Sequence, residues 1–337
     1  MKRPGSILST LVSSPYRLGF AVVCSLVLIL ALWWWYDTEP FTTEDLSFVT
    51  NVVPETTNDK PIKVQAKLYL PKSAKFPLSA VIIAPSSSGV EEVREVYYAR
   101  RLVEAGMAAL VIDSFSSRGL TDSQYDQSLI EQWDIENDAI AALAVLAADR
   151  RFKADRIAIM GVSKGGTVSM DTALEIRRQW MGVQDLSFAA HVAISPDCTW
   201  ITRNARTTGV PILFMLAELD DQTPAKPCLE EAERIRNAGN ERVETKVYKG
   251  AHHAWEELGN APHYDPEVEN YSRCRVWIED DGKMYSDETG ELLPEDDWHS
   301  WAEENCMFLG ATCCGGSLTL KETATRDIID FLRRSGL

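Results

Sequence analysis

A serine with the surroundings of a nucleophile lies in the segment Gly-Val-Ser-Lys-Gly at positions 161–165. An apolar run, residues 157–160, precedes it, and a plausible helix follows it. A Gly-x-Ser-x-Gly segment between a strand and a helix forms a sharp turn, in which the serine takes a strained backbone conformation and the glycines let neighbouring backbone approach. The turn presents the serine hydroxyl above the edge of the sheet. The pattern predicts that Ser163 is the nucleophile of a serine hydrolase, although such segments also mark ordinary tight turns.

Candidate acids follow the serine in the chain. Residues 211–216 form an apolar run typical of a buried strand, and an acidic, turn-like stretch follows it. Asp220 and Asp221 lie in that stretch. A carboxylate at the end of a strand can hold an imidazole in the correct tautomer and stabilise its protonated form. Either aspartate could do this, and either could equally be a simple turn residue.

A candidate base follows the next strand. Residues 243–248 alternate in the manner of a strand, and His252 and His253 come soon after them. Imidazole has the proton affinity that suits removal of a serine proton near neutral pH. The order serine, acid, histidine, each after a strand, is the order found in α/β-hydrolases. A triad of Ser163, Asp220 and His253 is therefore predicted.

With these residues in place, the chain resembles the dienelactone hydrolase-like branch of the α/β-hydrolases over about residues 48–337. In that family the acid lies four residues before a proline, in a pattern like Gly-x-x-Asp-x-x-x-Pro. Asp220 and Pro224 match this pattern, whereas Ala217 replaces the glycine. The resemblance thus favours Asp220 as the acid and leaves Asp221 as the alternative.

The family resemblance also selects between the two histidines. The catalytic histidine of the family is followed two residues later by an aromatic residue, which matches His253 with Trp255 rather than His252. Trp255 is accordingly a candidate for substrate binding. The enzyme that names the family uses a cysteine nucleophile, so Ser163 makes this chain more similar to the serine esterases of the family. Esters and lactones are the substrates that the resemblance implies.

Two backbone N–H groups are candidates for an oxyanion hole, which stabilises the charge that develops on the substrate carbonyl oxygen. One belongs to Lys164, directly after the nucleophile. The other belongs to the loop 85–89, which follows the apolar run 80–84 and, by resemblance, corresponds to the His-Gly-x-x-Gly type segment of the family. Ser87 is the predicted second donor. The alternative is that this loop merely joins a strand to a helix.

The fold class expected from these patterns is α/β, with a mostly parallel, doubly wound sheet and helices on both faces. Helices are predicted at about 93–105, 135–149 and 321–334. Arg118 follows a further predicted strand, residues 108–112, and is a candidate for binding an acyl or carboxylate group. A structural salt bridge is the alternative role for Arg118.

The N-terminal part of the chain has the features of a membrane anchor. Residues 18–36 are uncharged and largely apolar, with about the length needed to cross a bilayer. Basic residues precede this run and acidic residues follow it, so the positive-inside rule places the body outside the cytoplasm, on the periplasmic side in a bacterium. A cleaved signal peptide is the alternative. The predicted division is 1–17 cytoplasmic, 18–36 transmembrane signal anchor, 37–46 linker and 47–337 α/β-hydrolase domain.

A long segment, residues 262–320, separates the histidine loop from the last helix and is rich in acidic and aromatic residues. We interpret it as an insertion into the hydrolase domain. Residues 283–286 and 291–293 are predicted to form a small hairpin within it. The insertion is expected to be either a lid at the rim of the substrate site or a surface decoration.

Seven cysteines occur in the chain, one of them in the predicted anchor. The other six form an even set that suits disulfides in an oxidising compartment. The predicted pairs are Cys198 with Cys228 and Cys274 with Cys306, and the partners of the remaining two stay open. A zinc site is the weaker alternative, because no Cys-x-x-Cys or His-x-x-x-His spacing occurs and the chemistry needs neither a metal nor a cofactor.

The formal net charge of −16 at pH 7 disfavours binding to nucleic acid. The expected partner is a small ester or lactone, with the membrane contacted through the N-terminal helix. The main prediction is a membrane-anchored serine hydrolase that forms an acyl-enzyme intermediate. A serine peptidase or an acyltransferase with the same triad, and a non-catalytic binding protein with this fold, are the alternatives.

Overall fold

The computed structural model describes residues 24–25, 39–50, 61–258, 261–294 and 297–337. The chain divides into two compact units, residues 1–40 and 41–337, and the second contains the main β-sheet. Apart from positions 24 and 25, the predicted anchor at 18–36 lies outside the described residues. Within those ranges, no helix has the length and apolar character needed to span a bilayer.

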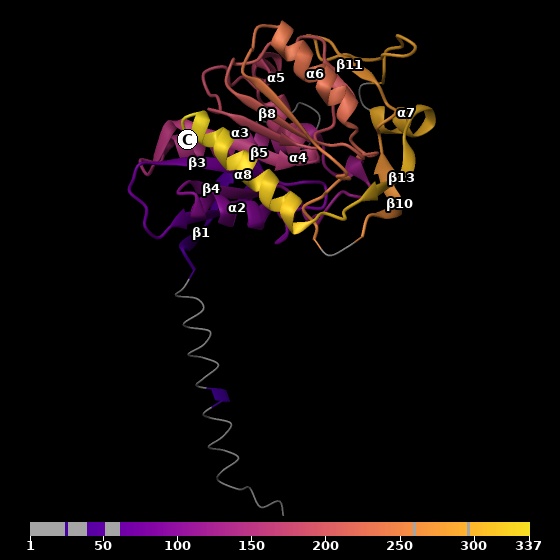
Figure 1. Ribbon diagram of the computed structural model, residues 1–337. Coiled ribbons are helices and arrows are strands. Elements are labelled where there is room, and N and C mark those ends of the chain that lie inside the picture. The colour runs from indigo at the N-terminus through magenta and orange to yellow at the C-terminus, as the bar shows by residue number, and fades with distance from the viewer. Residues whose placement is uncertain (1–23, 26–38, 51–60, 259–260, 295–296) are drawn as a thin grey trace, which may run out of the picture. The chain divides into compact units, whose positions relative to one another are not determined.

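A single eight-stranded sheet organises residues 41–337 (Figure 1). Its strands run parallel from β4 to β9, whereas β1 and β2 at one edge are antiparallel to their neighbours. This confirms the predicted mostly parallel sheet. Across the sheet the order is β1 (Phe41–Val49), β2 (Lys63–Pro71), β4 (Ala108–Asp113), β3 (Leu78–Ala84), β5 (Phe152–Val162), β6 (His191–Ile194), β8 (Ile212–Ala217) and β9 (Val243–Tyr248).

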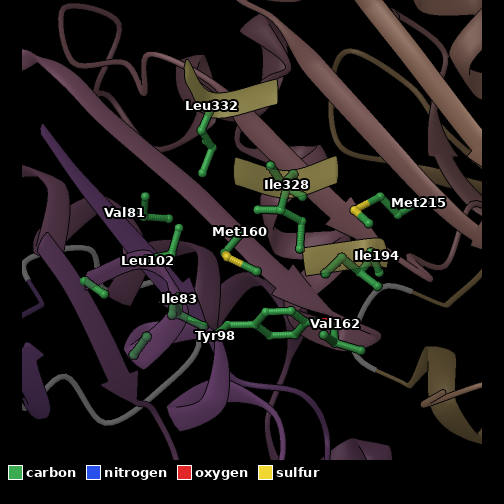
Figure 2. Packing of buried hydrophobic residues seen from close by; sticks show 14 of the residues in the cluster. Val81, Ile83, Tyr98, Leu102, Met160, Val162, Ile194, Met215, Ile328 and Leu332 are labelled. Atoms are coloured by element: carbon green, nitrogen blue, oxygen red, sulfur yellow. The ribbon is translucent and has the colours of Figure 1, made fainter. Parts of the chain in front are cut away.

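Helices cover both faces of the sheet, because successive side chains of a strand point to opposite faces and both faces of the central strands are apolar. On β3, Val81 and Ile83 belong to a core cluster with α2 and α8, while Ile82 belongs to a cluster with α3. Figure 2 shows the first cluster, in which Ile328 and Leu332 of α8 lie over the sheet. The helices are α2 (Glu95–Glu104), α3 (Gln132–Ala148), α4 (Lys164–Asp171), α5 (Glu175–Trp180), α6 (Ala225–Asn237), α7 (Trp298–Asn305) and α8 (Leu318–Arg334).

The predicted linker at 37–46 requires a correction. Strand β1 begins at Phe41 and pairs with β2 along its whole length, so residues 41–46 belong to the sheet. The segment looked like a spacer because most of its side chains are polar. An edge strand that turns only part of its surface to the core can have such a sequence, and in β1 only Phe48 is buried.

The segment 262–320 forms two small sheets beside the main one. Strand β10 (His263–Asn270) pairs with β13 (Phe308–Cys313), and β11 (Val276–Ile278) pairs with both β12 (Met284–Ser286) and β7 (Trp200–Thr202). The predicted hairpin forms, because residues 285 and 292 make an antiparallel bridge and the backbone N–H groups of Ser286 and Leu293 donate to the carbonyl oxygens of residues 291 and 284 at 2.9 and 2.8 Å. On its other side, β12 pairs with the preceding β11, which the sequence did not predict. The β-branched and aromatic residues of β11, followed by an Asp-Gly turn, account for this pairing.

Three disulfides join the cysteines of the folded unit. Cys198 pairs with Cys228 and Cys274 with Cys306, which are the two pairs that the sequence predicted. The third disulfide links the adjacent residues 313 and 314 at the end of β13. The first disulfide joins the segment after β6 to α6. The second joins two residues of the insertion whose sequence separation is 32.

Candidate active site

The turn between β5 and α4 holds Ser163 in a backbone conformation that few residues adopt, with φ 54° and ψ −121°. Small neighbours make this turn possible. A Cβ atom on Gly161 would lie 2.3 Å from the backbone of Gly165, and one on Gly165 would lie 2.4 Å from the carbonyl oxygen of Ala84. The glycines that drew attention in the sequence are thus required where β5, α4 and β3 meet.

Ser163, His253 and Asp220 come together although they are far apart in the chain. Nε2 of His253 lies 3.0 Å from Oγ of Ser163, and Nδ1 of the same ring lies 2.9 Å from Oδ2 of Asp220. His253 and Asp220 are buried. Ser163 follows β5, Asp220 follows β8 and His253 follows β9, all in the parallel part of the sheet. The three residues meet because the carboxyl ends of parallel strands lie at one edge of a sheet.

Asp220 is held as a carboxylate by several donors. Its Oδ1 accepts the backbone N–H groups of Gln222 at 3.0 Å and Thr223 at 2.8 Å, and its Oδ2 accepts the Thr223 hydroxyl at 3.0 Å. Burial alone would raise the pKa of Asp220, but the charge and hydrogen bond of His253, together with the backbone N–H of Thr223, lower it below its usual value. Asp221, the alternative acid, instead accepts the backbone N–H of Thr312 at 2.7 Å.

The charge of Asp220 also acts on the imidazole. Burial of His253 would by itself lower the pKa of the ring, but the charge and hydrogen bond of Asp220 outweigh burial and raise the pKa above its usual value. A ring with this pKa and a hydrogen bond from Nδ1 to a carboxylate can accept a proton at Nε2, the atom that faces Ser163.

The two predicted oxyanion donors flank Ser163. Lys164 is the first residue of α4, where a backbone N–H has no acceptor within the helix. Ser87 is buried after β3 and lines the same cavity as Ser163. The structure therefore places both residues beside Ser163.

A buried ion pair that the sequence did not reveal holds the loop 85–89. Oε1 of Glu95 accepts the backbone N–H of Ser86 at 3.2 Å, and Oε2 accepts that of Glu91 at 2.9 Å. Nε of Arg94 donates to Oε1 of Glu95 at 3.1 Å, and both side chains are almost fully buried. Adjacent charged residues at the start of an otherwise amphipathic helix were the only signal in the sequence for this positioning pair.

The Lys164 side chain turns away from the reacting atoms. Its Nζ donates to the carbonyl oxygens of Ile130 at 2.7 Å and Gln127 at 3.4 Å. Burial lowers the pKa of this amine to about 8. The Lys164 side chain thus connects the turn that contains Ser163 to the segment before α3. Its backbone N–H is the predicted oxyanion donor.

Neither predicted substrate-binding residue lines the cavities beside Ser163. The guanidinium of Arg118 donates to the fully buried carboxylate of Asp138 at 2.7 Å and to the Ser114 carbonyl at 2.7 Å, so it forms the structural salt bridge that was the alternative. Trp255 is fully buried and packs against Tyr248, with ring centroids 5.2 Å apart. Trp255, the aromatic residue that matches the family pattern, therefore belongs to the hydrophobic core in this chain.

Two cavities meet at Ser163. The larger, of about 240 Å³, has walls from the segment before α3, the chain after β6 and the insertion, which contributes Tyr271 and Trp298. The smaller, of about 60 Å³, lies beside His253 and Cys313. The insertion is therefore part of the rim of the larger cavity and not a decoration remote from it.

The described residues contain one group of closely spaced metal-ligand atoms, formed by His263, Cys313 and Cys314. The two cysteines of this group are joined to each other in a disulfide. The arrangement around Ser163 is suited to a different chemistry. A hydroxyl beside a buried imidazole, together with two adjacent backbone N–H groups, is suited to acyl transfer.

Comparison with known proteins identifies the family of the chain. A sequence model of the dienelactone hydrolase family matches residues 64–279, which is more than half of the chain. A Bradyrhizobium protein named "Probable 2-oxo-3-(5-oxofuran-2-ylidene)propanoate lactonase" is 28% identical over 192 residues, or 53% of this chain and 74% of that protein.

Two solved structures of esterases also resemble the chain in part. Thermogutta terrifontis esterase 2, phosphoramylated by tabun, has 16% sequence identity and a TM-score of 0.49, over 64% of this chain and 87% of that one. A thermostable esterase from Pseudomonas putida has 14% identity and a TM-score of 0.47, over 64% of this chain and 76% of that one.

The strand order, the nucleophile turn and the family match point to the same conclusion. The sheet and its helices form a fold of the α/β-hydrolase type. The chain belongs to the dienelactone hydrolase family and is a hydrolase that acts on ester bonds.

Proposed function

We propose that this chain is a serine hydrolase that cleaves carboxylic esters or lactones through an acyl-enzyme on Ser163. The observation that carries the proposal is the pair of contacts made by one buried ring, in which Nε2 of His253 lies 3.0 Å from Ser163 Oγ and Nδ1 lies 2.9 Å from Asp220 Oδ2. The lactonase name of the Bradyrhizobium relative supports the inclusion of lactones.

In the proposed mechanism, His253 takes the proton of the Ser163 hydroxyl as the oxygen attacks the substrate carbonyl. The backbone N–H groups of Lys164 and Ser87 stabilise the resulting oxyanion. The protonated imidazole then gives its proton to the leaving alcohol, which leaves the acyl group on Ser163. Water, activated by the same imidazole, releases the acid and restores the hydroxyl. Asp220 stays ionised throughout.

A fluorophosphonate probe tests the proposed triad without knowledge of the substrate. Such a probe reacts with serines that a base activates. The intact mass of residues 41–337 is expected to increase by one adduct on Ser163, with no adduct in Ser163→Ala and much slower labelling in His253→Ala. Asp221→Asn, which changes the carboxylate that faces Thr312, is the control and should label at a rate close to wild type. A folded wild-type protein without an adduct would refute the serine mechanism.

A panel of small 4-nitrophenyl esters and lactones, compared with peptide substrates and acyl acceptors, tests the reaction class. Hydrolysis of esters or lactones without cleavage of peptides is the expected result. Preferential transfer of the acyl group to an added alcohol or amine would instead identify an acyltransferase with the same triad.

Membrane anchoring through residues 18–36, with the catalytic domain outside the cytoplasm, is also part of the proposal. The uncharged apolar run with basic residues before it and acidic residues after it supports this topology. The full-length chain should remain in the membrane fraction after extraction with alkaline carbonate, and protease added from outside the cytoplasmic membrane should remove its catalytic domain. Release by carbonate would contradict the anchor.

A further inference from the structure

The larger cavity beside Ser163 carries more negative than positive groups. Its lining includes four carboxylates and two basic side chains, which are Glu131, Asp171, Asp197, Glu269, Lys164 and Arg177. An excess of carboxylates in a partly enclosed space favours cations over anions. Whether these carboxylates can bind a cationic substrate depends on which of them are already paired with groups of the protein.

Both basic groups are engaged by the protein. Arg177 donates to the buried Asp171 carboxylate at 2.8 Å, and its guanidinium lies over the rings of Trp133 and Trp180. The Lys164 amine donates to backbone carbonyl oxygens. The charge of Arg177 is therefore offset by the buried carboxylates of Asp171 and Glu136, and the Lys164 amine is directed at backbone oxygens, so the two basic groups give the cavity no excess of positive charge.

Asp197 differs from the other carboxylates of the cavity. Its Oδ1 accepts the backbone N–H and the hydroxyl of Thr199, both at 2.8 Å. Within the described part of the chain, its Oδ2 has no hydrogen-bond partner, and the side chain lines the cavity while remaining partly exposed. A partly desolvated carboxylate with an oxygen that accepts no hydrogen bond attracts a cationic group of a ligand, whether or not that group has an N–H to donate.

The position of Asp197 is fixed relative to the nucleophile. Its backbone N–H donates to Oγ1 of Thr167 at 2.9 Å, and the backbone N–H of Thr167 donates to the carbonyl oxygen of Ser163 at 2.9 Å. Two hydrogen bonds thus connect Asp197 to Ser163 through α4. A substrate attached at Ser163 would meet Asp197 at a set separation.

Three aromatic side chains form a cluster in the same cavity. The rings of Trp200 and Trp298 have centroids 4.6 Å apart, and that of Tyr271 lies 6.1 Å from that of Trp298. All three residues line the same cavity as Asp197. The faces of such rings attract organic cations, and most strongly when water is excluded.

The acyl part of the substrate is the part that reaches this wall. The leaving alcohol must take its proton from His253, so it lies on the side of that ring, and His253 lines the smaller cavity but not the larger one. The acyl group extends away from His253 and enters the larger cavity.

We infer that Asp197, together with Trp200, Trp298 and Tyr271, forms a subsite for an ammonium group on the acyl chain of the substrate. The inference rests on the proposed serine hydrolase function and names its substrate class as esters or lactones of cationic acids. Asp197 supplies the charge and the aromatic faces surround the alkyl groups of the cation.

A matched pair of esters tests the subsite. The 4-nitrophenyl ester of 4-(trimethylammonio)butanoic acid carries a cation, and that of 5,5-dimethylhexanoic acid has the same shape without the charge. Each kcat/KM is divided by the alkaline hydrolysis rate of the same ester, which removes the difference in intrinsic reactivity. Wild-type enzyme should favour the cationic ester by about tenfold or more. A ratio near one, with both esters hydrolysed, would overturn the inference and leave the proposed function intact.

Variants locate the preference at Asp197. Asp197→Asn should reduce the ratio between the two esters to near one, and because the ratio is taken within one enzyme, a general loss of activity cancels. Trp298→Leu should reduce the ratio in part, and it serves as the second variant if Asp197→Asn does not fold. Glu131→Gln removes one charge from the same cavity and is the control. An equal loss of preference in Glu131→Gln would show a general field and not a subsite.

A measurement without turnover separates this inference from the proposed function. Calorimetric titration of wild-type protein with butyltrimethylammonium should show saturable binding, which Asp197→Asn should weaken about tenfold. Binding without ester hydrolysis would retain the subsite and reject the proposed reaction. Absence of binding to a protein that hydrolyses esters would reject the subsite alone.

Discussion

The carbonyl oxygen of His253 accepts the backbone N–H of Cys314 at 2.7 Å. The end of β13, the last strand of the insertion, therefore contacts the proposed base directly, and residues 253 and 313 also form a bridge. The insertion contributes to the support of the histidine loop as well as to the wall of the larger cavity.

The contacts of the two neighbouring aspartates predict opposite effects of the same substitution. Asp220→Asn should lower kcat for ester hydrolysis about 10⁴-fold, because an amide no longer fixes the correct imidazole tautomer or stabilises its charge. Asp221→Asn should change kcat little, since this side chain faces the N–H of Thr312. Steady-state kinetics of both variants make the comparison, and similar losses in the two would contradict the assignment of the acid.

The raised pKa of His253 predicts how activity depends on pH. Only the neutral ring can accept the Ser163 proton, so kcat/KM should fall about tenfold per pH unit below the pKa of the free enzyme. The charge and hydrogen bond of Asp220 raise that pKa against the effect of burial, so the acidic limb should be centred above the usual histidine value of about 6.5.

Asp220→Asn removes the charge that raises the pKa of His253 and should therefore move the limb of any residual activity to lower pH. A wild-type limb centred below about 6.5 would be inconsistent with this account. The pH profile is measured on one neutral ester over the range in which the protein stays folded, as monitored by circular dichroism.

The oxyanion role proposed for Ser87 requires its backbone N–H and not its hydroxyl. Ser87→Pro removes the N–H and should lower kcat by about 10²–10³-fold, whereas Ser87→Ala keeps the N–H and should lose far less. Both variants are compared by kcat and by thermal unfolding. An equal loss in the two, at equal stability, would assign any role to the hydroxyl and remove this backbone N–H from the oxyanion hole.

The disulfide that closes the insertion should stabilise the fold. Replacing both Cys274 and Cys306 by serine should lower the free energy of unfolding by about 2–4 kcal/mol, because the bond constrains a long segment of the unfolded chain. Replacing the adjacent Cys313 and Cys314 should lower it less, since their sequence separation is 1 instead of 32. Denaturant unfolding compares the two double variants, and a larger loss for the adjacent pair would contradict the chain-entropy argument.

The parallel strands could be predicted because their sequences reflect burial on both faces. The apolar runs at 80–84 and 157–160 lie in β3 and β5, and the run at 211–216 lies in β8 except for its first residue. Strand β1 was missed, because an edge strand needs few buried side chains. The pairing of β10 with β13 was also beyond the sequence, since the partners are separated by tens of residues and much of β10 is polar and exposed.

Local patterns identified the residues around Ser163 more successfully than those at the far end of the cavity. Ser163, Asp220 and His253 each follow a recognisable strand, and the structure brings them together. Asp197 had no such signal, because the role inferred for it depends on the contact of its backbone with Thr167, 30 residues away, and on an oxygen that has no hydrogen-bond partner among the described residues. The sequence left two roles open for Arg118, because a basic residue after a strand gives no sign of the buried carboxylate of Asp138 with which it forms an ion pair.

The Cα atoms of Cys274 and Cys306 lie 5.1 Å apart, so the segment between these two cysteines begins and ends at nearly the same point. Ile278, Met284 and Trp298, which lie between these cysteines, line the larger cavity. The segment is thus closed by a disulfide and contributes residues to the cavity, although none of its strands belongs to the main sheet. Substitutions within this closed segment can therefore alter the wall of the larger cavity and leave the strands of the main sheet unchanged.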